Sequence, residues 1–262
     1  MNNSPLKISC IIITKNEERN IGRCIESLNS VADEIIVIDS YSTDRTEEIC
    51  AQFNIRFVKS EWKGYSETKN YGNSLASHEY ILSLDADEAL SEELRTEIKL
   101  LKNNNSIADA YFLNRLTNYC GKWIWHCGWY PDKKLRLWNR NKGKWQGRIH
   151  ESVIMEEYSI SGKLKGNIHH YSYYTINEHI AQMMHFTDLM AETLVNKRKK
   201  HFLFNLLVSP VIKFIVSFFI KAGFRDGYYG FIICVLSSVA TFLKYAKAYQ
   251  LLRSAKQAER KS

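Results

Sequence analysis

The sequence predicts an α/β domain with a parallel sheet, followed by a helical tail. Its first hundred residues alternate short runs rich in Ile and Val with helical patterns, which is typical of parallel strands joined by crossover helices. An aromatic-rich segment follows at 103–175, and the chain from 176 onward is helical, apolar and basic. A length of 262 residues, 45% of them hydrophobic, is enough for one substantial domain with an appendage.

Four strands and four helices are expected in the first part of the chain. The strands are the short apolar runs Ile8–Thr14, Glu34–Asp39, Arg56–Lys59 and Tyr80–Leu84. The helices are Ile21–Leu28 capped by Asn20, a helix from Ser42 or Thr43 to about Phe53, Ser66–Leu75, and Ser91–Lys102 capped by Ser91. This alternation places the carboxyl ends of the strands on one edge of a sheet, where ligands bind in such folds.

The segment 103–175 changes character and predicts two further strands with much loop. Ala110–Arg115 and Leu135–Trp138 are the expected strands, and five of the six tryptophans fall in this segment. Loops of this kind beside a nucleotide-binding half commonly shape the site of a second substrate. An aromatic core beneath long loops explains any single tryptophan equally well. A long helix is expected next, over Asn177–Lys200.

The basic charge of the chain is concentrated in its last quarter. The segment Lys197–Ser262 holds thirteen Lys or Arg and two acids, or +11, so that the net charge of +8 leaves −3 for residues 1–196. A basic segment can bind nucleic acid or an anionic lipid surface. Because this one is interleaved with long apolar runs, we expect a membrane surface as its partner and no nucleic acid.

The N-terminus and the cysteines indicate a cytoplasmic location for the first domain. Residues 1–7 are short and polar, and the apolar stretch Ile8–Ile13 is too brief for a signal peptide. The six cysteines contain no CxxC pair and lie in or beside apolar stretches, as reduced, buried thiols do. They are therefore not expected to bind zinc.

Polar or acidic side chains follow three of the four predicted strands. They are Thr14 to Glu17 after the first, Asp39 at the end of the second, and Asp85 to Glu88 after the fourth. No GxGxxG follows the first strand and no GxxxxGK[ST] occurs, which argues against dinucleotide-binding and P-loop proteins. Two carboxylates one residue apart, Asp85 and Asp87, can share a hard divalent cation that neutralises substrate phosphates. A solvated turn that also contains Glu88 is the alternative explanation.

Four ordered motifs carry a family resemblance: ISCIIITKNEERNIG from Ile8, EIIVIDSYSTD from Glu34, KNYG from Lys69 and YILSLDADE from Tyr80. Together they resemble the family-two inverting glycosyltransferases of GT-A fold, whose nucleotide-binding domain is Rossmann-like. Pro131-Asp132, then Leu135 to Trp138, then Gly147 to Glu151 are most similar to the lipopolysaccharide inner-core glucosyltransferases. The resemblance is strong over about 6–175 and looser in the tail, which implies a catalytic domain at 1–175 and a membrane-associated tail at 176–262.

The resemblance implies a donor site at the sheet edge. Thr14, Glu17 and Asp39 would hold the nucleotide base and ribose, with Asp39 accepting a hydrogen bond from a uracil N–H. Lys69 would lie near the diphosphate or ribose, where a cation is electrostatically sensible, and Asp85 would contact the donor as well. Asp39 as a turn or capping residue, and Lys69 on a solvated helix face, are the alternatives.

The same resemblance implies a metal site and a general base. Mg²⁺ or Mn²⁺ would be held through Asp87, with Asp85 nearby, to stabilise the departing diphosphate. Glu151 would take the proton of the acceptor hydroxyl, and Asp132 is the next candidate for the base. His150 would either orient Glu151 or simply pack. A surface pair of Glu151 with Arg148 or Arg136 is the alternative.

The implied reaction moves a hexose, with glucose expected, from a UDP-sugar to a hydroxyl of a glycolipid or lipopolysaccharide-core acceptor, with inversion, at the cytoplasmic face of the inner membrane. A phosphatase or phosphotransferase with Asp85 as nucleophile is a rival, although such enzymes carry the DxD after their first strand. A non-catalytic membrane scaffold is the second rival, and it would not need polar groups at the strand ends.

Two apolar stretches in the tail, Phe202–Ile220 and Gly227–Leu243, lie at or just below the ~20 residues that span a bilayer. The basic run Lys197–Lys200 precedes them and further basic residues follow, so both flanks are expected in the cytoplasm. Lys213 is costly at bilayer depth, which favours a first helix in the interface and a second that lies deeper. A helical pair packed on the catalytic domain is the alternative.

Overall fold

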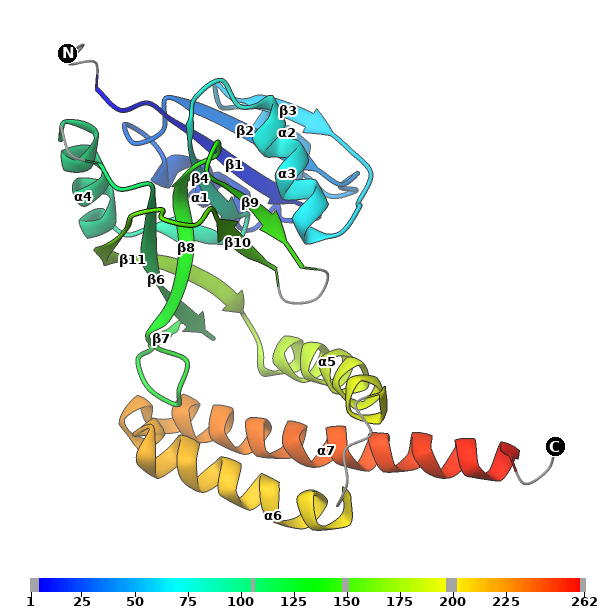
Figure 1. Cartoon of the computed structure of the whole chain (residues 1–262). Helices are drawn as coiled ribbons and strands as arrows, with labels where there is room; N and C mark the ends of the chain where they lie inside the picture. The colour runs from blue at the N-terminus through cyan, green and yellow to red at the C-terminus, as the bar shows by residue number, and fades with distance from the viewer. Residues whose placement is uncertain (1–4, 105–106, 148–150, 197–201, 260–262) are drawn as a thin grey trace. The chain divides into compact units, whose positions relative to one another are not determined.

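The computed structural model describes residues 5–104, 107–147, 151–196 and 202–259 (Figure 1). Arg148, His150 and the basic run Lys197–Lys200, on which some expectations depend, lie outside the described residues. The chain forms two compact units. The first unit comprises Met1–Leu116 and Pro131–Tyr171, and the second comprises Thr117–Tyr130 and Ser172–Ser262.

The first unit is built on the expected parallel sheet, with the strand order β3-β2-β1-β4. These strands are β1 (Ile8–Thr14), β2 (Glu34–Asp39), β3 (Arg56–Lys59) and β4 (Tyr80–Asp85). The predicted ranges are confirmed apart from one extra residue on β4. Strand β1, which pairs with β2 and β4, is buried along its whole length, because a central parallel strand is covered on both faces.

Antiparallel strands extend the sheet beyond β4. The remaining order is β8-β6-β11-β5, and β7 pairs with β6. The strands are β5 (Glu88–Leu90), β6 (Ala110–Tyr119), β7 (Lys122–Ile124), β8 (Asp132–Asn139) and β11 (Ser161–Tyr173). A separate hairpin is formed by β9 (Gly143–Gln146) and β10 (Ser152–Met155). The two strands expected in this region are confirmed and are longer than expected.

The helices of the first unit are α1 (Ile21–Ser27), α2 (Thr46–Cys50), α3 (Tyr65–Leu75) and α4 (Glu92–Lys102). Ser91 caps α4 as expected, since its Oγ accepts from the Leu94 amide at 3.2 Å. The expected start of α2 was wrong: Ser42 and Thr43 lie in a loop bonded to Asn16, whose amide donates to Ser42 Oγ at 2.8 Å and whose side chain accepts from Thr43 N. These bonds use the groups that would have begun a helix.

Helix α3 packs closely on the sheet through Gly72. A Cβ at this position would lie 2.4 Å from Ile11 Cγ2, so a larger side chain would push α3 away from β1. The close approach brings Lys69, one helical turn earlier, against the carboxyl end of the sheet. Two buried apolar clusters lie in this unit, one including residues of α1 and α4 and the other including Trp138 and Trp145.

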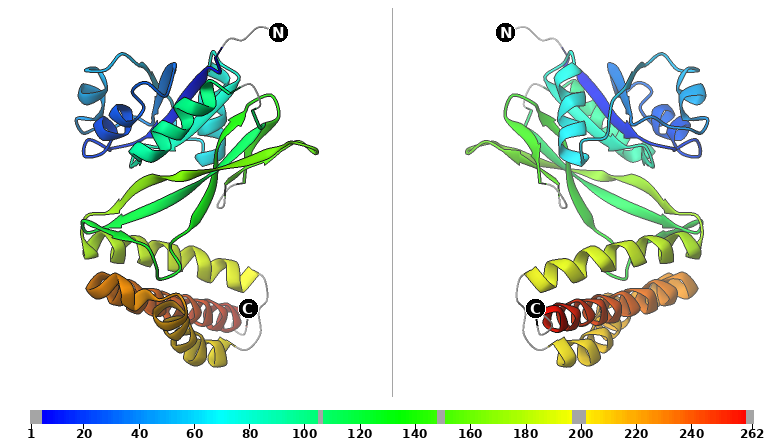
Figure 2. Two further views of the ribbon diagram at one scale, coloured as in Figure 1. Left: turned by 90° about the vertical axis from the view of Figure 1, so that its left-hand side faces the viewer. Right: turned by 90° about the vertical axis from the view of Figure 1, so that its right-hand side faces the viewer.

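The second unit is helical. Its elements are α5 (Ile176–Asn196), α6 (Phe202–Ile215), a π-helical turn (Val216–Ile220), a 3₁₀ turn (Gly223–Asp226) and α7 (Gly227–Glu259). Helix α7 lies against both α5 and α6 (Figures 1 and 2). Among the described residues, one helical segment, Gly223–Ala255, is long and apolar enough to cross a membrane, and Phe204–Ile220 is a shorter apolar helix.

Buried Asp226 ties β7 and the loop after it to the start of α7. Its carboxylate accepts from the backbone amide of His126 at 2.8 Å and from that of Trp125 at 3.3 Å. Its own carbonyl accepts from Lys122 Nζ at 2.7 Å. The segment Thr117–Tyr130 therefore belongs structurally with the C-terminal helices.

Candidate active site

Asp85 lies at the end of β4 between two cations. Its Oδ1 is 2.9 Å from Lys69 Nζ and its Oδ2 is 2.9 Å from Arg136 Nη2. Lys69 comes from α3 and Arg136 from β8, and both side chains are almost fully buried. Burial alone would raise the pKa of the Asp85 carboxyl, but the charges of Lys69 and Arg136 outweigh it and hold this pKa well below its usual range. Asp85 is therefore an anion fixed in place.

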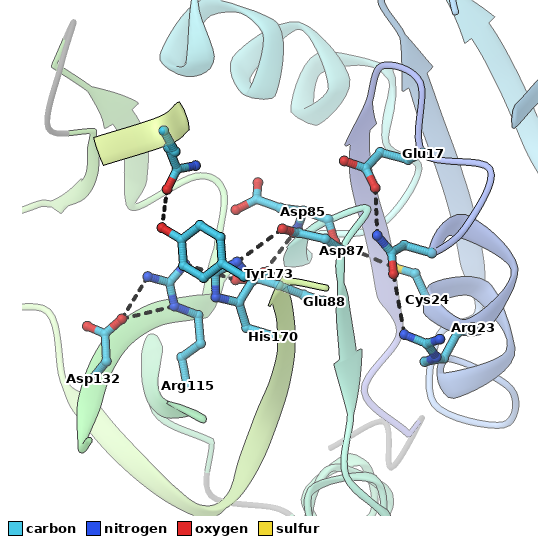
Figure 3. A network of polar contacts seen from close by, with 12 residues as sticks. Glu17, Arg23, Cys24, Asp85, Asp87, Glu88, Arg115, Asp132, His170 and Tyr173 are labelled. Carbon is cyan, nitrogen blue, oxygen red and sulfur yellow. Dashed lines mark hydrogen bonds and ion pairs between the residues drawn. The ribbon is translucent and has the colours of Figure 1, made fainter. Parts of the chain in front are cut away.

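A buried acid, Glu88, supports the same motif. Glu88 Oε1 is 2.9 Å from Arg136 Nη2 and 3.3 Å from Arg115 Nη1, while its Oε2 accepts from the backbone amide of Asp85 at 3.0 Å. Arg115 in turn contacts Asp132 at 2.8 Å. Figure 3 shows Asp85, Glu88, Arg115 and Asp132 side by side in this network. The turn that carries the DxD is thus held rigidly and is not a loosely solvated loop.

Asp87 points to a different partner. Its Oδ2 lies 3.0 Å from Nε2 of His170, a residue of β11, and both side chains are partly exposed (Figure 3). A carboxylate oxygen and an imidazole nitrogen are ligands that Mn²⁺ accepts, and Mg²⁺ sites commonly use one or two carboxylates with substrate phosphates. No cluster of three or more metal-ligating side chains occurs in the described part of the chain. The residues present therefore fit a cation that a substrate diphosphate would help to bind.

The charges of Asp87 and His170 act on the carboxyl group of Glu17. Burial raises the pKa of the Glu17 carboxyl to about 7, an Asn20 hydrogen bond opposes the shift, and the negative charge of Asp87 adds to it. The Asn20 side chain donates to Glu17 Oε2 at 2.8 Å. The sequence predicted that the Asn20 side chain caps α1. Asn20 does precede the helix, but its side chain makes no capping hydrogen bond and holds Glu17 instead.

Thr14 and Asp39 are paired neighbours at the ends of β1 and β2. Both carboxylate oxygens of Asp39 are occupied by Ser42, whose amide donates at 2.9 Å and whose hydroxyl donates at 2.5 Å. The turn role that the sequence left open is therefore present. The Thr14 hydroxyl is buried and has no hydrogen-bond partner among the described residues. Their role in nucleotide binding stays a prediction.

Glu151 and Asp85 line one cavity of about 400 Å³. Glu151 Oε1 lies 3.8 Å from Lys69 Nζ, so the lysine lies within reach of both acids. The ring of Trp145, 4.5 Å from Lys69 Nζ, forms another part of the cavity wall. The alternative partner Arg148 and the orienting residue His150 lie outside the described residues. Their roles stay predictions.

Three functional candidates were missed from sequence: Arg136, Arg115 and His170. Arg136 was noted only as part of a motif and as a possible surface partner of Glu151. A charged residue inside the apolar run LRLW of an expected strand is nevertheless a signal, because buried charges require partners. Arg115 and His170 carried no such signal. Their strands join the sheet by pairings that the sequence does not reveal.

A parallel sheet with a DxD at its carboxyl edge and antiparallel strands beyond it defines a transferase of GT-A type. The glycosyl transferase family 2 model matches residues 9–160, and the chain belongs to this family. An uncharacterized glycosyltransferase of Rickettsia typhi is 32% identical over 94% of this chain and 87% of its own length. The lipopolysaccharide core biosynthesis glycosyltransferase LpsC of Rhizobium meliloti is 31% identical over 94% of this chain and 93% of its own.

Solved structures resemble the chain more distantly. The crystal structure of S. aureus TarS 1-349 in complex with UDP-GlcNAc has a TM-score of 0.46 and 15% identity, covering 97% of this chain and 92% of that one. Such a likeness is too remote to bear on the substrate. Family membership makes the chain a glycosyltransferase, which sets aside the phosphatase as the assignment.

Proposed function

We propose that this glycosyltransferase moves a hexose, glucose in the first instance, from a UDP-sugar to a hydroxyl of a glycolipid or lipopolysaccharide-core acceptor, with inversion and with a divalent cation. The observation that carries the proposal is the shared cavity of Asp85 and Glu151, with Lys69 near both. A relative named for lipopolysaccharide core biosynthesis, similar over almost the whole chain, supports the acceptor class.

The donor would lie along the carboxyl edge of the parallel strands. Asp39 retains free lone pairs after its bonds to Ser42 and can accept from a uracil N–H, while the unpartnered Thr14 hydroxyl lies beside it. Glu17 follows in the same loop. Lys69 supplies positive charge where the diphosphate is expected.

The cation would be held by Asp87 and His170, with Asp85 as the second carboxylate that the DxD predicts. Bound Mg²⁺ or Mn²⁺ would supply charge that stabilises the leaving diphosphate. The two oxygens of Asp85 already face Lys69 and Arg136. Asp85 would therefore also hold the side chains of Lys69 and Arg136 beside the diphosphate.

Glu151 is the proposed general base. It takes the proton of the acceptor hydroxyl as that oxygen forms a bond to the anomeric carbon, and the bond from this carbon to the diphosphate breaks, releasing the nucleotide diphosphate. Glu151 lines the cavity together with Asp85 of the DxD. A general base must lie within hydrogen-bond reach of the acceptor hydroxyl, and a carboxylate in this wall meets that requirement for an acceptor bound in the cavity.

The second unit would hold the enzyme at the cytoplasmic face of the membrane, where a lipid-linked acceptor is available. Helix α6 exposes Phe204, Leu207, Val211 and Ile215, which share one helix face. Exposed apolar surface of this kind marks an interaction site, and the basic charge of the tail favours anionic lipid.

The test is turnover of UDP-glucose by the purified protein with Mn²⁺, measured as UDP release. Glu151→Gln should lose roughly 10²–10⁴-fold in turnover with unchanged UDP affinity, the usual size of a general-base contribution. Glu156→Gln, an exposed acid five residues away, is the matched control and should keep full turnover. No turnover with any UDP-sugar, together with phosphate release from a monoester, would overturn the proposal.

A further inference from the structure

We propose that the cavity beside Glu151 recognises an anionic group, a phosphate or carboxylate, carried by the acceptor, through Lys133 and Arg136. This inference rests on the proposed function, because it names a chemical feature of the acceptor in that reaction. Three observations carry it: the place of the cavity in the sheet, its unsatisfied N–H groups, and the balance of charge in its wall.

The cavity lies on the acceptor side of the sheet. Its lining comes from β4, β6 and β8, from Trp145 of β9, and from Glu151, Ser152 and Val153. The proposed nucleotide residues Thr14, Glu17 and Asp39 follow β1 or end β2, and none of them lines it. Strand β4, which ends in Asp85, separates the two groups in the strand order. A group bound in this cavity therefore meets the general base without occupying the proposed base and ribose part of the donor site, and Asp85, at the proposed diphosphate end of that site, is the lining residue that the two share.

The cavity wall contains N–H donors with no acceptor. Arg136 is 3% exposed, and among the described residues its Nε and Nη1 have no hydrogen-bond partner. Trp145 Nε1, also buried, has none either. Buried donors without partners are costly, so such a group in a native protein requires an explanation, and a bound ligand is one. Arg136 uses only Nη2 for Asp85 and Glu88, which leaves the rest of its guanidinium for such a ligand.

Among the described residues, one cation at the cavity has no ion pair. Lys134 and Arg115 both pair with Asp132, at 3.1 Å and 2.8 Å, and Arg115 also pairs with Glu88 at 3.3 Å. Lys133, which also lines the cavity, is exposed and makes no ion pair with any described residue. An anion beside Lys133 would balance the positive charge of this lysine and would also accept hydrogen bonds from Arg136. A neutral hydroxyl could accept these hydrogen bonds but would leave the charge of Lys133 unbalanced.

A ligand group with several oxygens fits the N–H groups of Arg136 and the charge of Lys133 better than a single carbonyl does. Phosphate and carboxylate accept from guanidinium in charge-assisted hydrogen bonds, which are stronger than neutral ones. Apolar walls from Phe112, Leu135 and Val153 leave room for the sugar that bears the anion. The anion would thereby help to select the acceptor and to present its hydroxyl to Glu151.

The experiment measures anion binding by calorimetry in protein saturated with UDP and Mg²⁺, so that the nucleotide site is occupied. Inorganic phosphate and acetate are the two probes, and their relative affinities distinguish a phosphate from a carboxylate. Lys133→Ala should weaken the preferred probe at least about fivefold, and Lys133→Arg should largely restore it. Lys163→Ala, an exposed lysine on β11 outside the cavity wall, should change nothing.

Two results overturn the inference. One is that neither probe binds the wild-type protein, or that Lys133→Ala binds both as well as wild type does. The other is that Lys133→Ala weakens UDP itself by the same factor, which would assign the lysine to the donor diphosphate. Failure of the proposed function is visible separately, as an absence of UDP binding or of UDP-sugar turnover in the wild-type protein.

Discussion

Arg136 and Glu88 form a 2.9 Å ion pair in which the side chains are 4% and 0% exposed. The same guanidinium nitrogen also contacts Asp85, so one arginine joins both ends of the DxD turn. Glu88 depends most on this cation, because its side chain is fully buried and cannot be solvated if the cation is lost. Arg136 is therefore a positioning residue for the motif.

Replacing Arg136 by Met should destabilise the fold strongly. The change leaves Glu88 with Arg115 at 3.3 Å as its remaining cation and deprives Asp85 of one of two, so we expect the free energy of unfolding to fall by about 3 kcal/mol. Urea unfolding measures it. Arg45→Met breaks an exposed pair with Glu48 and should cost less than about 1 kcal/mol. Equal losses in the two variants would contradict the network.

The metal prediction concerns Asp87. Asp87→Asn weakens the carboxylate ligand, so UDP affinity measured with Mn²⁺ should fall at least about tenfold, whereas affinity measured without metal should hardly change. His170→Gln should act in the same direction because it removes the imidazole at 3.0 Å. If the wild-type enzyme keeps its full rate in EDTA, the metal has no role.

Glu17 predicts a pH dependence of stability in the metal-free protein. Burial raises its pKa from 4.5 to about 7, so the protonated form is favoured in the folded state. The stability that this form contributes is complete below about pH 4.5 and is lost as the pH rises to about 7. Glu17→Gln should thus be more stable than wild type at pH 8 and similar to it at pH 4. Urea unfolding at both values checks this, with exposed Glu26→Gln as a control that should show no pH effect.

The parallel half of the fold was predictable because buried strands leave a strong pattern. Each of β1, β2 and β4 is an apolar run that ends at a polar residue, and the structure places these ends as expected. Strands β5, β7, β9, β10 and β11 were missed. β11 is the clearest case: its sequence SGKLKGNIHHYSY has no apolar run, since much of it is only partly buried. Its partner β5 lies about 80 residues away in the sequence, and only tertiary pairing joins them.

The candidate site shows the same division between residues that the sequence predicts and residues that it does not. Asp85, Asp87, Lys69 and Glu151 were chosen from strand ends and family motifs, and the structure brings Asp85, Lys69 and Glu151 together. The partners that hold the acids come from distant segments: Arg136 is 51 residues from Asp85, and His170 is 83 residues from Asp87. Such partners depend on the order of strands in the sheet, which periodicity does not encode.

The prediction that the C-terminal helices associate with a membrane can be made more specific from the helix faces that remain exposed in the second unit. Helix α7 exposes Tyr228, Phe231, Val239, Phe242 and Tyr249, whose spacing places them on one face, while another α7 face packs on α5 and α6. Lys247 donates to α5 residues and pairs with Asp188 at 2.7 Å, so its charge is already balanced within the protein. Lys213 of α6 is exposed and, at 100° per residue, points roughly half a turn away from Val211. One-sided apolar faces with a lysine opposite are typical of helices that lie in the interface.

We therefore predict that the exposed face of α6 contributes to membrane binding through Leu207 and Val211, which are 69% and 58% exposed. Replacing both by Gln removes two side chains that would be buried in lipid, so the partition coefficient onto anionic vesicles should fall by at least roughly tenfold. Vesicle sedimentation measures it. Ile160→Gln removes an equally exposed apolar residue, 68% exposed, from the first unit and should leave binding unchanged. Full-length protein that stays in solution with such vesicles at low salt would refute the anchor, and equal losses in the two variants would move the contact away from α6.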